Sequence, residues 1–200
     1  MVAMSRVALS RSARFAPIAV LAIAVLAGCA GTGNVNTSVT GSLGYQFGPG
    51  NITVYKSQGR AMVGNVNGTT LQGRPLSLAS YRGDYVVVNF WQSECSPCRS
   101  EEPALEALSK EYASKGVRFV GIDWGDNRSS GLSFERQFGV TYPSLIDRAD
   151  SLVLGFPGGA PSTPTTIVID PHGGIAARIN GPSDYTHIKR LLNDLLSESA

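Results

Sequence analysis

The sequence predicts one α/β domain in which helices flank a central mixed β-sheet. Two apolar runs rich in β-branched residues, 85–90 and 117–124, lack alternation and are typical of strands that are buried on both faces. A helical pattern lies between these runs, and a strand–turn–strand unit followed by another helix ends the chain. This order of elements indicates a layered α/β architecture.

The composition fits one globular domain with additional flanking segments. The chain has 200 residues, of which 42% are hydrophobic and 16% are charged. The formal net charge is +2, and part of it comes from Arg6, Arg11 and Arg14, in a segment that we expect to be removed. No lysine-rich run with interleaved aromatic residues is present, so the sequence predicts no nucleic-acid partner.

The N-terminus has the pattern of a secretory signal. Residues 1–14 carry three arginines and no acid, and residues 15–27 form an apolar run shorter than the ~20 residues of a membrane-spanning helix. The run ends in Leu26-Ala27-Gly28-Cys29, which resembles a bacterial lipobox. The resemblance implies cleavage before Cys29 and a diacylglyceryl group on its sulfur, so 1–28 would be a lipoprotein signal peptide. An uncleaved signal anchor and a soluble secreted protein are the alternatives.

The segment after Cys29 is expected to be a tether. Residues 30–50 are mostly small and polar, and such a segment buries too little apolar area to offset its chain entropy. We assign 29–62 to a flexible tether and 63–200 to the folded domain. The short run Ile52–Tyr55 fits either an added edge strand or more linker, and the sequence leaves this open.

The domain is expected to begin with short extended pieces. Val63–Val66 is a possible strand, and Asn67-Gly68 is a strong signal for a turn. Gly73-Arg74-Pro75 indicates a second break. Leu76 and Leu78 alternate with serines, as on a half-buried strand.

The centre of the domain is a strand followed by a long helix. Asp84 precedes the buried strand 85–90, and a helix is predicted from Pro97 to about Lys115. Its apolar stripe consists of Leu105, Leu108 and Tyr112. Pro103 lies inside this helix and is expected to kink it, whereas Gly116 is a suitable residue to end it.

The second half of the domain alternates short elements. A buried strand is predicted at 117–124, a helix at 132–138 that ends at Gly139, and an extended piece at 142–146. The closing hairpin consists of strands 165–170 and 175–179 joined by a turn at 172–174, and the last helix covers 184–196 with Ser183 as its N-cap. The apolar face of that helix consists of Ile188, Leu191, Leu192 and Leu195.

Cys95 and Cys98 are the candidate reaction centre. They are separated by two residues and lie where the buried strand is followed by the helix. A helix N-terminus favours a thiolate through its dipole and free backbone N–H groups. Cys95 is therefore expected to be the attacking nucleophile, and Cys98, one turn into the helix, the resolving thiol.

Two other interpretations of this cysteine pair are disfavoured. A structural zinc site needs four ligands, and the only other candidates, His172 and His187, lie far downstream with no second cysteine pair. A purely structural disulfide would contribute little, since so short a loop hardly restrains the unfolded chain. The sequence therefore predicts no metal site and no cofactor.

The motifs around the cysteines resemble the thioredoxin superfamily. More narrowly, the chain resembles the membrane-attached thiol:disulfide oxidoreductases of the TlpA/ResA type, a group that includes reductants of cytochrome c maturation. The resemblance covers roughly 64–198. Its motifs are Val88-Asn89-Phe90-Trp91, Cys95-Ser96-Pro97-Cys98-Arg99, Glu101-Glu102-Pro103, Ser162-Thr163-Pro164-Thr165-Thr166 and Asp170-Pro171-His172-Gly173-Gly174.

The resemblance also implies roles for single residues. Pro164 falls at the position of a cis-proline beside the cysteine pair, which would expose the Thr163 backbone to a partner peptide and hinder metal capture. Glu101 matches an acidic residue that tunes the thiols. Pro97 would set the geometry of the redox loop, and Trp91 would either pack in the core or border the site.

Two positions depart from common patterns. Asn89 stands six residues before Cys95, where thioredoxin itself has a buried Asp, so Asn89 cannot relay a proton; members of the TlpA/ResA group often lack that Asp. Glu94 stands where a Trp is common. A carboxylate beside Cys95 opposes formation of the thiolate, which favours a reductant.

The predicted function is therefore an extracytoplasmic protein-disulfide reductase held at a bacterial membrane by the lipid on Cys29. Its substrates would be protein disulfides, including haem-attachment cysteines of apocytochrome c, and its electrons would come from a membrane thiol-transfer protein. A disulfide-forming oxidant of the same fold and a non-enzymatic binding module are the alternatives. A peroxiredoxin-like peroxidase is disfavoured because Gln92 replaces the Thr expected three residues before the cysteine. The sequence names neither the direction of electron flow nor the partner nor the membrane.

Overall fold

The structure is a computed structural model that describes residues 44–47 and 51–198. The predicted signal peptide, the lipidation of Cys29 and the predicted tether up to residue 43 lie outside the described residues. Within the described ranges, no helix has the length and apolar character needed to cross a bilayer.

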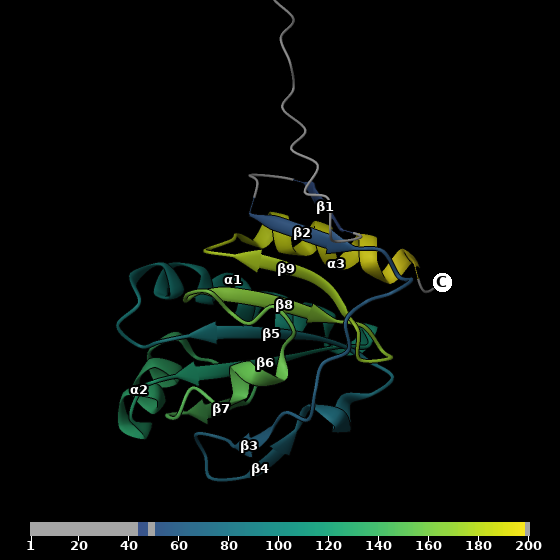
Figure 1. Ribbon diagram of the computed structural model, residues 1–200. Helices are drawn as coiled ribbons and strands as arrows, with labels where there is room; N and C mark the ends of the chain where they lie inside the picture. The colour runs from purple at the N-terminus through teal and green to yellow at the C-terminus, as the bar shows by residue number, and fades with distance from the viewer. Residues whose placement is uncertain (1–43, 48–50, 199–200) are drawn as a thin grey trace, which may run out of the picture. The chain divides into compact units, whose positions relative to one another are not determined.

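A seven-stranded mixed sheet forms the centre of the domain, in the order β1-β2-β9-β8-β5-β6-β7 (Figure 1). Its strands are β1 (Gly44–Phe47), β2 (Ile52–Tyr55), β5 (Tyr85–Trp91), β6 (Val117–Trp124), β7 (Ser144–Asp147), β8 (Thr165–Ile169) and β9 (Ile175–Asn180). β5, β6 and β7 are parallel to one another, whereas the remaining pairs are antiparallel. The predicted mixed sheet is confirmed, and β5 lies in its interior between β8 and β6.

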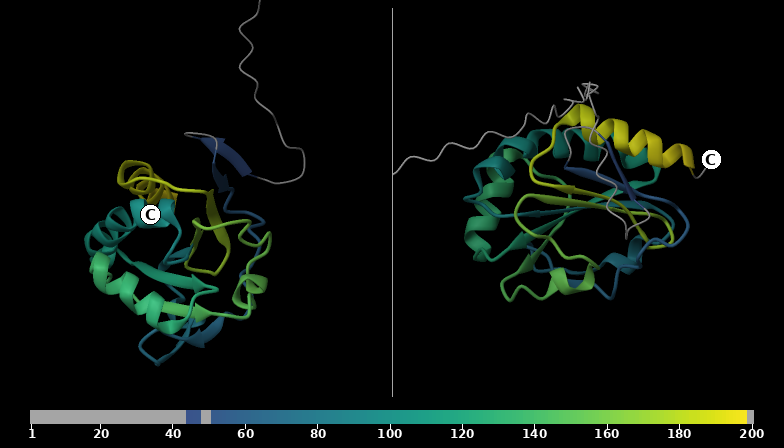
Figure 2. Two further views of the ribbon diagram at one scale, coloured as in Figure 1. Left: turned by 90° about the vertical axis from the view of Figure 1, so that its left-hand side faces the viewer. Right: turned by 45° about the horizontal axis from the view of Figure 1, so that its top comes forward.

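Three helices cover one face of this sheet, as the left view of Figure 2 shows. They are α1 (Ser96–Tyr112), α2 (Arg128–Phe138) and α3 (Tyr185–Glu198). The other face is covered by short elements, namely the 3-10 turns η1 (Leu78–Tyr81) and η3 (Leu152–Gly155) and the two-stranded sheet of β3 (Asn67–Thr69) and β4 (Pro75–Ser77). A further 3-10 turn, η2 (Ala113–Lys115), follows α1.

Alternation along β5 divides the core into two layers. Tyr85 and Val87 pack with the apolar stripes of α1 and α3, whereas Val86, Val88 and Phe90 pack on the opposite face. All seven residues of β5 are buried. The absence of alternation in the sequence therefore reflects a strand covered on both sides.

Most of the predicted elements are confirmed. β6 has the predicted bounds, and the predicted hairpin is β8 and β9. Gly116 and Gly139 adopt the left-handed conformation after η2 and α2, as helix-ending glycines do. Pro103 lies inside α1, and the kink expected there remains a prediction.

The predicted turn at Asn67-Gly68 is wrong. Both residues lie in β3 and pair with Ser77 and Leu76. Gly68 packs closely there, because a Cβ atom would lie 3.2 Å from a methyl carbon of Leu145. The chain turns instead at Gly73, whose φ is +82°.

The predicted strand at 63–66 is also wrong, although Val63 and Val66 are buried. The Val63 N–H donates to the carbonyl of Gly173, and the Val66 carbonyl accepts from Leu78. The segment therefore bonds to two different parts of the domain and follows no single neighbouring strand. Apolar composition alone did not reveal this.

Two boundaries differ from the prediction. Ile52–Tyr55 is strand β2, paired with β9, so the folded domain begins before residue 63. The helix predicted at 132–138 begins at Arg128, because the side chain of Asn127 caps it by accepting from the Ser130 N–H at 3.0 Å.

The N-cap of α3 is Asp184, whose carboxylate accepts a hydrogen bond from the His187 N–H at 2.9 Å. The predicted cap, Ser183, is therefore wrong by one residue. The Ser183 N–H instead donates to a side chain of α1, Glu101, at 3.0 Å. This contact joins the start of the last helix to the candidate active site.

Candidate active site

The junction of β5 and α1 places Cys95 at the N-cap of the helix. Cys95 has extended backbone angles (φ −72°, ψ 105°), and its Sγ accepts a hydrogen bond from the Cys98 N–H at 3.2 Å. Cys95 and Cys98 form a disulfide with a Cα–Cα separation of 5.3 Å. Backbone N–H groups at a helix start stabilise negative charge, so the reduced Cys95 sulfur would be favoured as a thiolate.

The two sulfurs differ in accessibility. Cys95 is half-buried, whereas Cys98 is only 1% exposed. Cys98 packs against Leu71, Trp91 and Phe134. A partner protein can therefore reach Cys95, and Cys98 can react only with a sulfur already held on Cys95.

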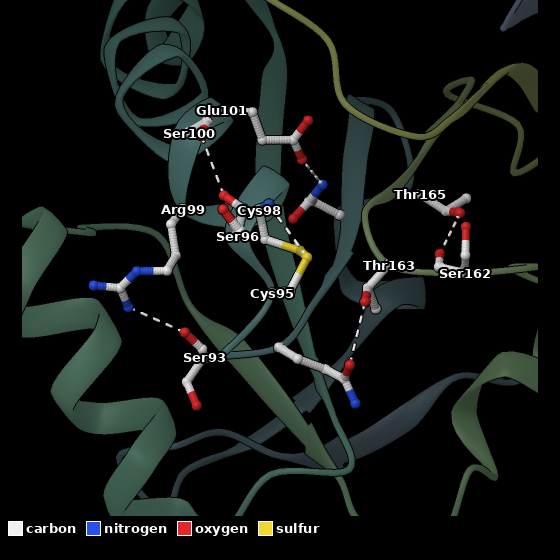
Figure 3. The surroundings of a disulfide bond; sticks show 12 residues. Ser93, Cys95, Ser96, Cys98, Arg99, Ser100, Glu101, Ser162, Thr163 and Thr165 are labelled. Atoms are coloured by element: carbon white, nitrogen blue, oxygen red, sulfur yellow. Dashed lines mark hydrogen bonds between the residues drawn. A yellow bond between two sulfur atoms is a disulfide. The ribbon is translucent and has the colours of Figure 1, made fainter.

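Thr163 faces the disulfide from the β8 side, while Ser93 and Arg99 lie on the other side (Figure 3). The Thr163–Pro164 peptide bond is cis, as the family resemblance implied. The Thr163 hydroxyl donates to the side-chain oxygen of Gln92 at 3.3 Å. Among the described residues, none forms a hydrogen bond with the backbone of Thr163, which leaves that backbone free to pair with an extended chain.

Glu101 lies one turn after Cys98 on the same helix and is 3% exposed. Its Oε1 accepts from the Asn89 amide at 2.8 Å, and its Oε2 accepts from the Ser183 N–H at 3.0 Å. The Asn89 amide also donates to the Thr166 hydroxyl at 3.0 Å. Burial raises the pKa of Glu101 to about 7, against the opposing effect of the Ser183 and Asn89 hydrogen bonds.

Glu102 is equally buried but belongs to another part of the molecule. It accepts a hydrogen bond from the Tyr142 hydroxyl at 2.6 Å. Burial, together with three neighbouring carboxyl groups, raises the pKa of Glu102 to about 8 although the Tyr142 bond opposes this. Its hydrogen-bond partner comes from the segment before β7.

The remaining predicted site residues occupy different positions. Pro97 is exposed at the first turn of α1. Trp91 is 1% exposed, and its ring stacks on Phe134 with a centroid distance of 4.2 Å. Trp91 therefore packs in the core beneath the cysteine pair, the first of the two positions expected for it, and its role in binding a substrate stays a prediction. Glu94 is exposed beside Cys95.

Sequence reasoning missed several residues that complete the site. Gln92, Thr166 and Ser183 contact it from three different segments. Ser183 contributes only a backbone N–H, for which a sequence carries no signal. Thr166 lies inside a recognised motif and Gln92 directly follows one, so both could have been singled out on that ground.

The two candidate histidines do not join the cysteines. His172 is exposed in the turn between β8 and β9, and His187 pairs with Asp184 on α3. In the part of the chain that the structure describes, no three side chains of the metal-binding types lie close enough to hold an ion. The chemistry available at the site is that of the two sulfurs and the neighbouring carboxyl group.

Comparison with known proteins gives the same fold and the same class of chemistry. Residues 60–178 match the AhpC/TSA family. Thiol-disulfide oxidoreductase ResA from Geobacillus thermodenitrificans is 34% identical over 125 residues, which are 62% of this chain and 71% of that protein. This match confirms the resemblance to ResA-type oxidoreductases.

Solved structures are similar over most of the domain. A thioredoxin-family thiol:disulfide interchange protein from Chlorobium tepidum TLS has a TM-score of 0.64 and 30% identity, covering 70% of this chain and 99% of that chain. A DsbF homologue from Corynebacterium diphtheriae has a TM-score of 0.68 and 29% identity, covering 77% of this chain and 99% of that chain. The predicted thioredoxin-like fold is thus confirmed.

Proposed function

We propose that this chain, which belongs to the AhpC/TSA family and is a protein-disulfide oxidoreductase with a thioredoxin-like fold, reduces protein disulfides outside the cytoplasm. One observation supports the mechanism above all others: a half-buried Cys95 at a helix N-cap, bonded to a Cys98 that is 1% exposed. This asymmetry separates an attacking sulfur from a resolving one.

In the proposed mechanism, the Cys95 thiolate attacks one sulfur of a partner disulfide. A Cys95–partner disulfide forms, the partner S–S bond breaks, and the released partner thiolate takes up a proton. The Cys98 thiol then loses its proton and attacks Cys95 Sγ. The Cys95–Cys98 disulfide forms, the second partner thiol leaves protonated, and two electrons have passed to the partner.

We assign the proton from Cys98 to Glu101. A pKa of about 7 suits a group that accepts and returns a proton near neutral pH. Asn89 donates to one oxygen of Glu101, which favours the ionised form, and its own side-chain oxygen is buried and accepts no hydrogen bond from any described residue. If the amide rotated, that oxygen would accept from a protonated Glu101, so Asn89 can serve both states.

We assign docking of the partner to Thr163 and Pro164. The free backbone of Thr163 provides one N–H and one C=O beside the disulfide, as a strand edge does for an added strand. Pro97 would shape the turn that presents Cys95. Backbone pairing depends little on the partner's side chains, so it gives low sequence specificity. Such specificity suits an enzyme that acts on several protein disulfides.

The direction, partners and location belong to the same proposal. Glu94 places a carboxylate beside Cys95, which opposes thiolate formation and supports a reductant. By the ResA-type resemblance, we propose that the substrates include haem-attachment cysteines of apocytochrome c, and that a membrane thiol-transfer protein supplies electrons. A lipid on Cys29 would hold the chain at the extracytoplasmic face of a bacterial membrane.

The reduction potential of the Cys95–Cys98 pair tests the direction. A value near ~−270 mV, as in thioredoxin, is expected for a reductant, whereas a value near ~−120 mV would assign the chain to disulfide formation. Cys95→Ser should abolish turnover of a protein disulfide, and Cys98→Ser should accumulate a mixed disulfide on Cys95. Full activity of Cys95→Ser would refute the mechanism.

The location has its own test, the intact mass of protein extracted from membranes. We expect a mature chain that starts at Cys29 and carries the added mass of a lipid. A chain that starts elsewhere without lipid would remove the anchor from the proposal and leave the redox mechanism untouched.

A further inference from the structure

Asp123 is a buried acid that the proposed mechanism does not use. It lies near the end of β6 and has no exposed surface. On the two adjacent strands, its register partners are Trp91 and Ile146, both apolar. From α2, Gly131 approaches so closely that a Cβ atom there would overlap with the Asp123 Oδ2. Apolar groups and backbone therefore enclose this carboxyl group on several sides.

An ionised carboxylate at this position would have no compensating partner. Among residues 44–47 and 51–198, no N–H or O–H group donates to either oxygen of Asp123. The charged groups that face it are both acidic, Asp126 from the following loop and Glu135 from α2. An unpaired charge in such surroundings is costly, whereas a protonated carboxyl group can donate a hydrogen bond to a neighbouring carboxylate.

Asp126 connects this carboxyl group to the reaction centre. Its Oδ2 accepts a hydrogen bond from the Ser93 N–H at 2.6 Å. The Ser93 carbonyl in turn accepts from the Arg99 guanidinium at 3.0 Å, and the Cys95 N–H donates to the Gln92 carbonyl at 3.2 Å. The loop of residues 92–94, which leads into Cys95, is thus tied through Asp126 to the segment that follows β6.

We propose that Asp123 is a positioning residue that keeps a proton shared with Asp126 and thereby holds the 92–94 loop in the conformation that presents Cys95. The protonated Asp123 donates to an oxygen of Asp126, and Asp126 accepts from the Ser93 N–H. Removing this proton places two negative charges side by side and forces Asp126 away from Ser93. Presentation of Cys95 is then weakened at alkaline pH.

A raised pKa of Asp123 agrees with this geometry. Burial, followed by the negative charge of Asp126, raises the pKa of Asp123 to about 8. Asp123 therefore stays protonated at neutral pH and ionises within the range where thiol exchange becomes fast. The expected effect on Cys95 rests on the proposed function, in which Cys95 is the attacking thiol. The proton shared between Asp123 and Asp126 does not rest on that function.

The test follows the Ser93 amide resonance and the Asp123 carboxyl carbon by NMR during a pH titration of the oxidised full chain. The oxidised form is used because the disulfide-bonded sulfurs of Cys95 and Cys98 do not titrate. In the unmodified protein we expect both signals to change together with one inflection near pH 8. In Asp123→Asn, whose amide still donates to Asp126 but cannot ionise, the Ser93 inflection should disappear.

Glu102→Gln is the matched control, since Glu102 is another buried carboxyl group with a raised pKa but bonds to Tyr142. It should leave the Ser93 inflection in place. An Asp123 carbon that titrates near pH 4, or a Ser93 inflection that persists in Asp123→Asn, would overturn the inference. If that variant does not fold, the titration of the unmodified protein decides alone. None of these outcomes depends on the reductase assay, so this inference and the proposed function can fail separately.

Discussion

Glu101 and Glu102 are neighbours in sequence, yet they face two different regions of the molecule. Both lie in α1, both are at most 3% exposed, and burial raises the pKa of both. Glu101 faces the region of the disulfide and bonds to Asn89 and Ser183. Glu102 faces the region before β7 and bonds to Tyr142.

The comparison teaches that a perturbed pKa does not identify a functional residue by itself. Successive residues of an α-helix are rotated by about 100° around its axis. That single step separates a carboxyl group that bonds to Asn89 and Ser183 from one that bonds to the buried Tyr142. We infer catalytic function for Glu101 from the proton transfer proposed for it, and a structural role for Glu102 from its bond to Tyr142. Substitutions at the two acids and at their partners test that division.

Glu101→Gln should lower the rate of disulfide reduction by about 100-fold near neutral pH, because a general acid–base group is lost while the side-chain shape is kept. Glu102→Gln should leave the rate unchanged. The measurement is stopped-flow reduction of a protein disulfide under single-turnover conditions. An equal loss of rate in the two variants would contradict the assignment of different roles to Glu101 and Glu102.

Tyr142→Phe should reduce the free energy of unfolding by ~1–3 kcal/mol, because the buried Glu102 loses its hydroxyl donor. The redox activity of this variant should equal that of the unmodified protein. Urea denaturation at constant pH measures the effect as a lower midpoint with an unchanged m-value. A fall in activity without a fall in stability would move Tyr142 into the functional region.

The pH dependence of stability should separate the two acids. Each has a folded-state pKa above its value in the unfolded chain, so the stability that protonation provides is complete below about pH 4.5 and declines as the pH rises. The decline ends near pH 7 for Glu101 and near pH 8 for Glu102.

Glu102→Gln should therefore reduce the slope with which the free energy of unfolding falls with pH, by ~1.4 kcal/mol per pH unit between about pH 4.5 and 8. Glu101→Gln should do so only up to about pH 7. Urea denaturation at a series of pH values gives both curves. Identical pH windows would contradict the different surroundings described for the two groups.

Asp184→Ala should have the smallest effect, ~1 kcal/mol of stability, through loss of the α3 N-cap. Because Ser183 precedes this cap and donates to Glu101, loosening it should also raise the pKa of Glu101 and shift the activity profile toward alkaline pH. Asp194→Ala, in the same helix, is the control, since its side chain is 61% exposed and its distance to Arg190 is 3.9 Å. An equal shift in that control would remove the link between α3 and the site.

Local sequence was sufficient wherever a residue's role depends on its immediate neighbours in the chain. Three features follow from local sequence: the buried strand β5 from its β-branched run, the helix-ending glycines from glycine's access to left-handed backbone, and the cysteine pair at the start of α1 from its fixed spacing. The same local reasoning misplaced the turn at Asn67-Gly68. The close packing of Gly68 against Leu145 is visible only in the structure.

The sequence by itself determined the fold class and the candidate reacting sulfurs, because both are encoded in short contiguous patterns. The tertiary structure was needed to show that Glu101 bonds to Asn89 whereas Glu102 bonds to Tyr142, and that Asp126, which follows β6, bonds to Ser93. The physical reason is that burial and hydrogen bonding depend on groups distant in sequence, which are brought together only when the sheet and its helices pack.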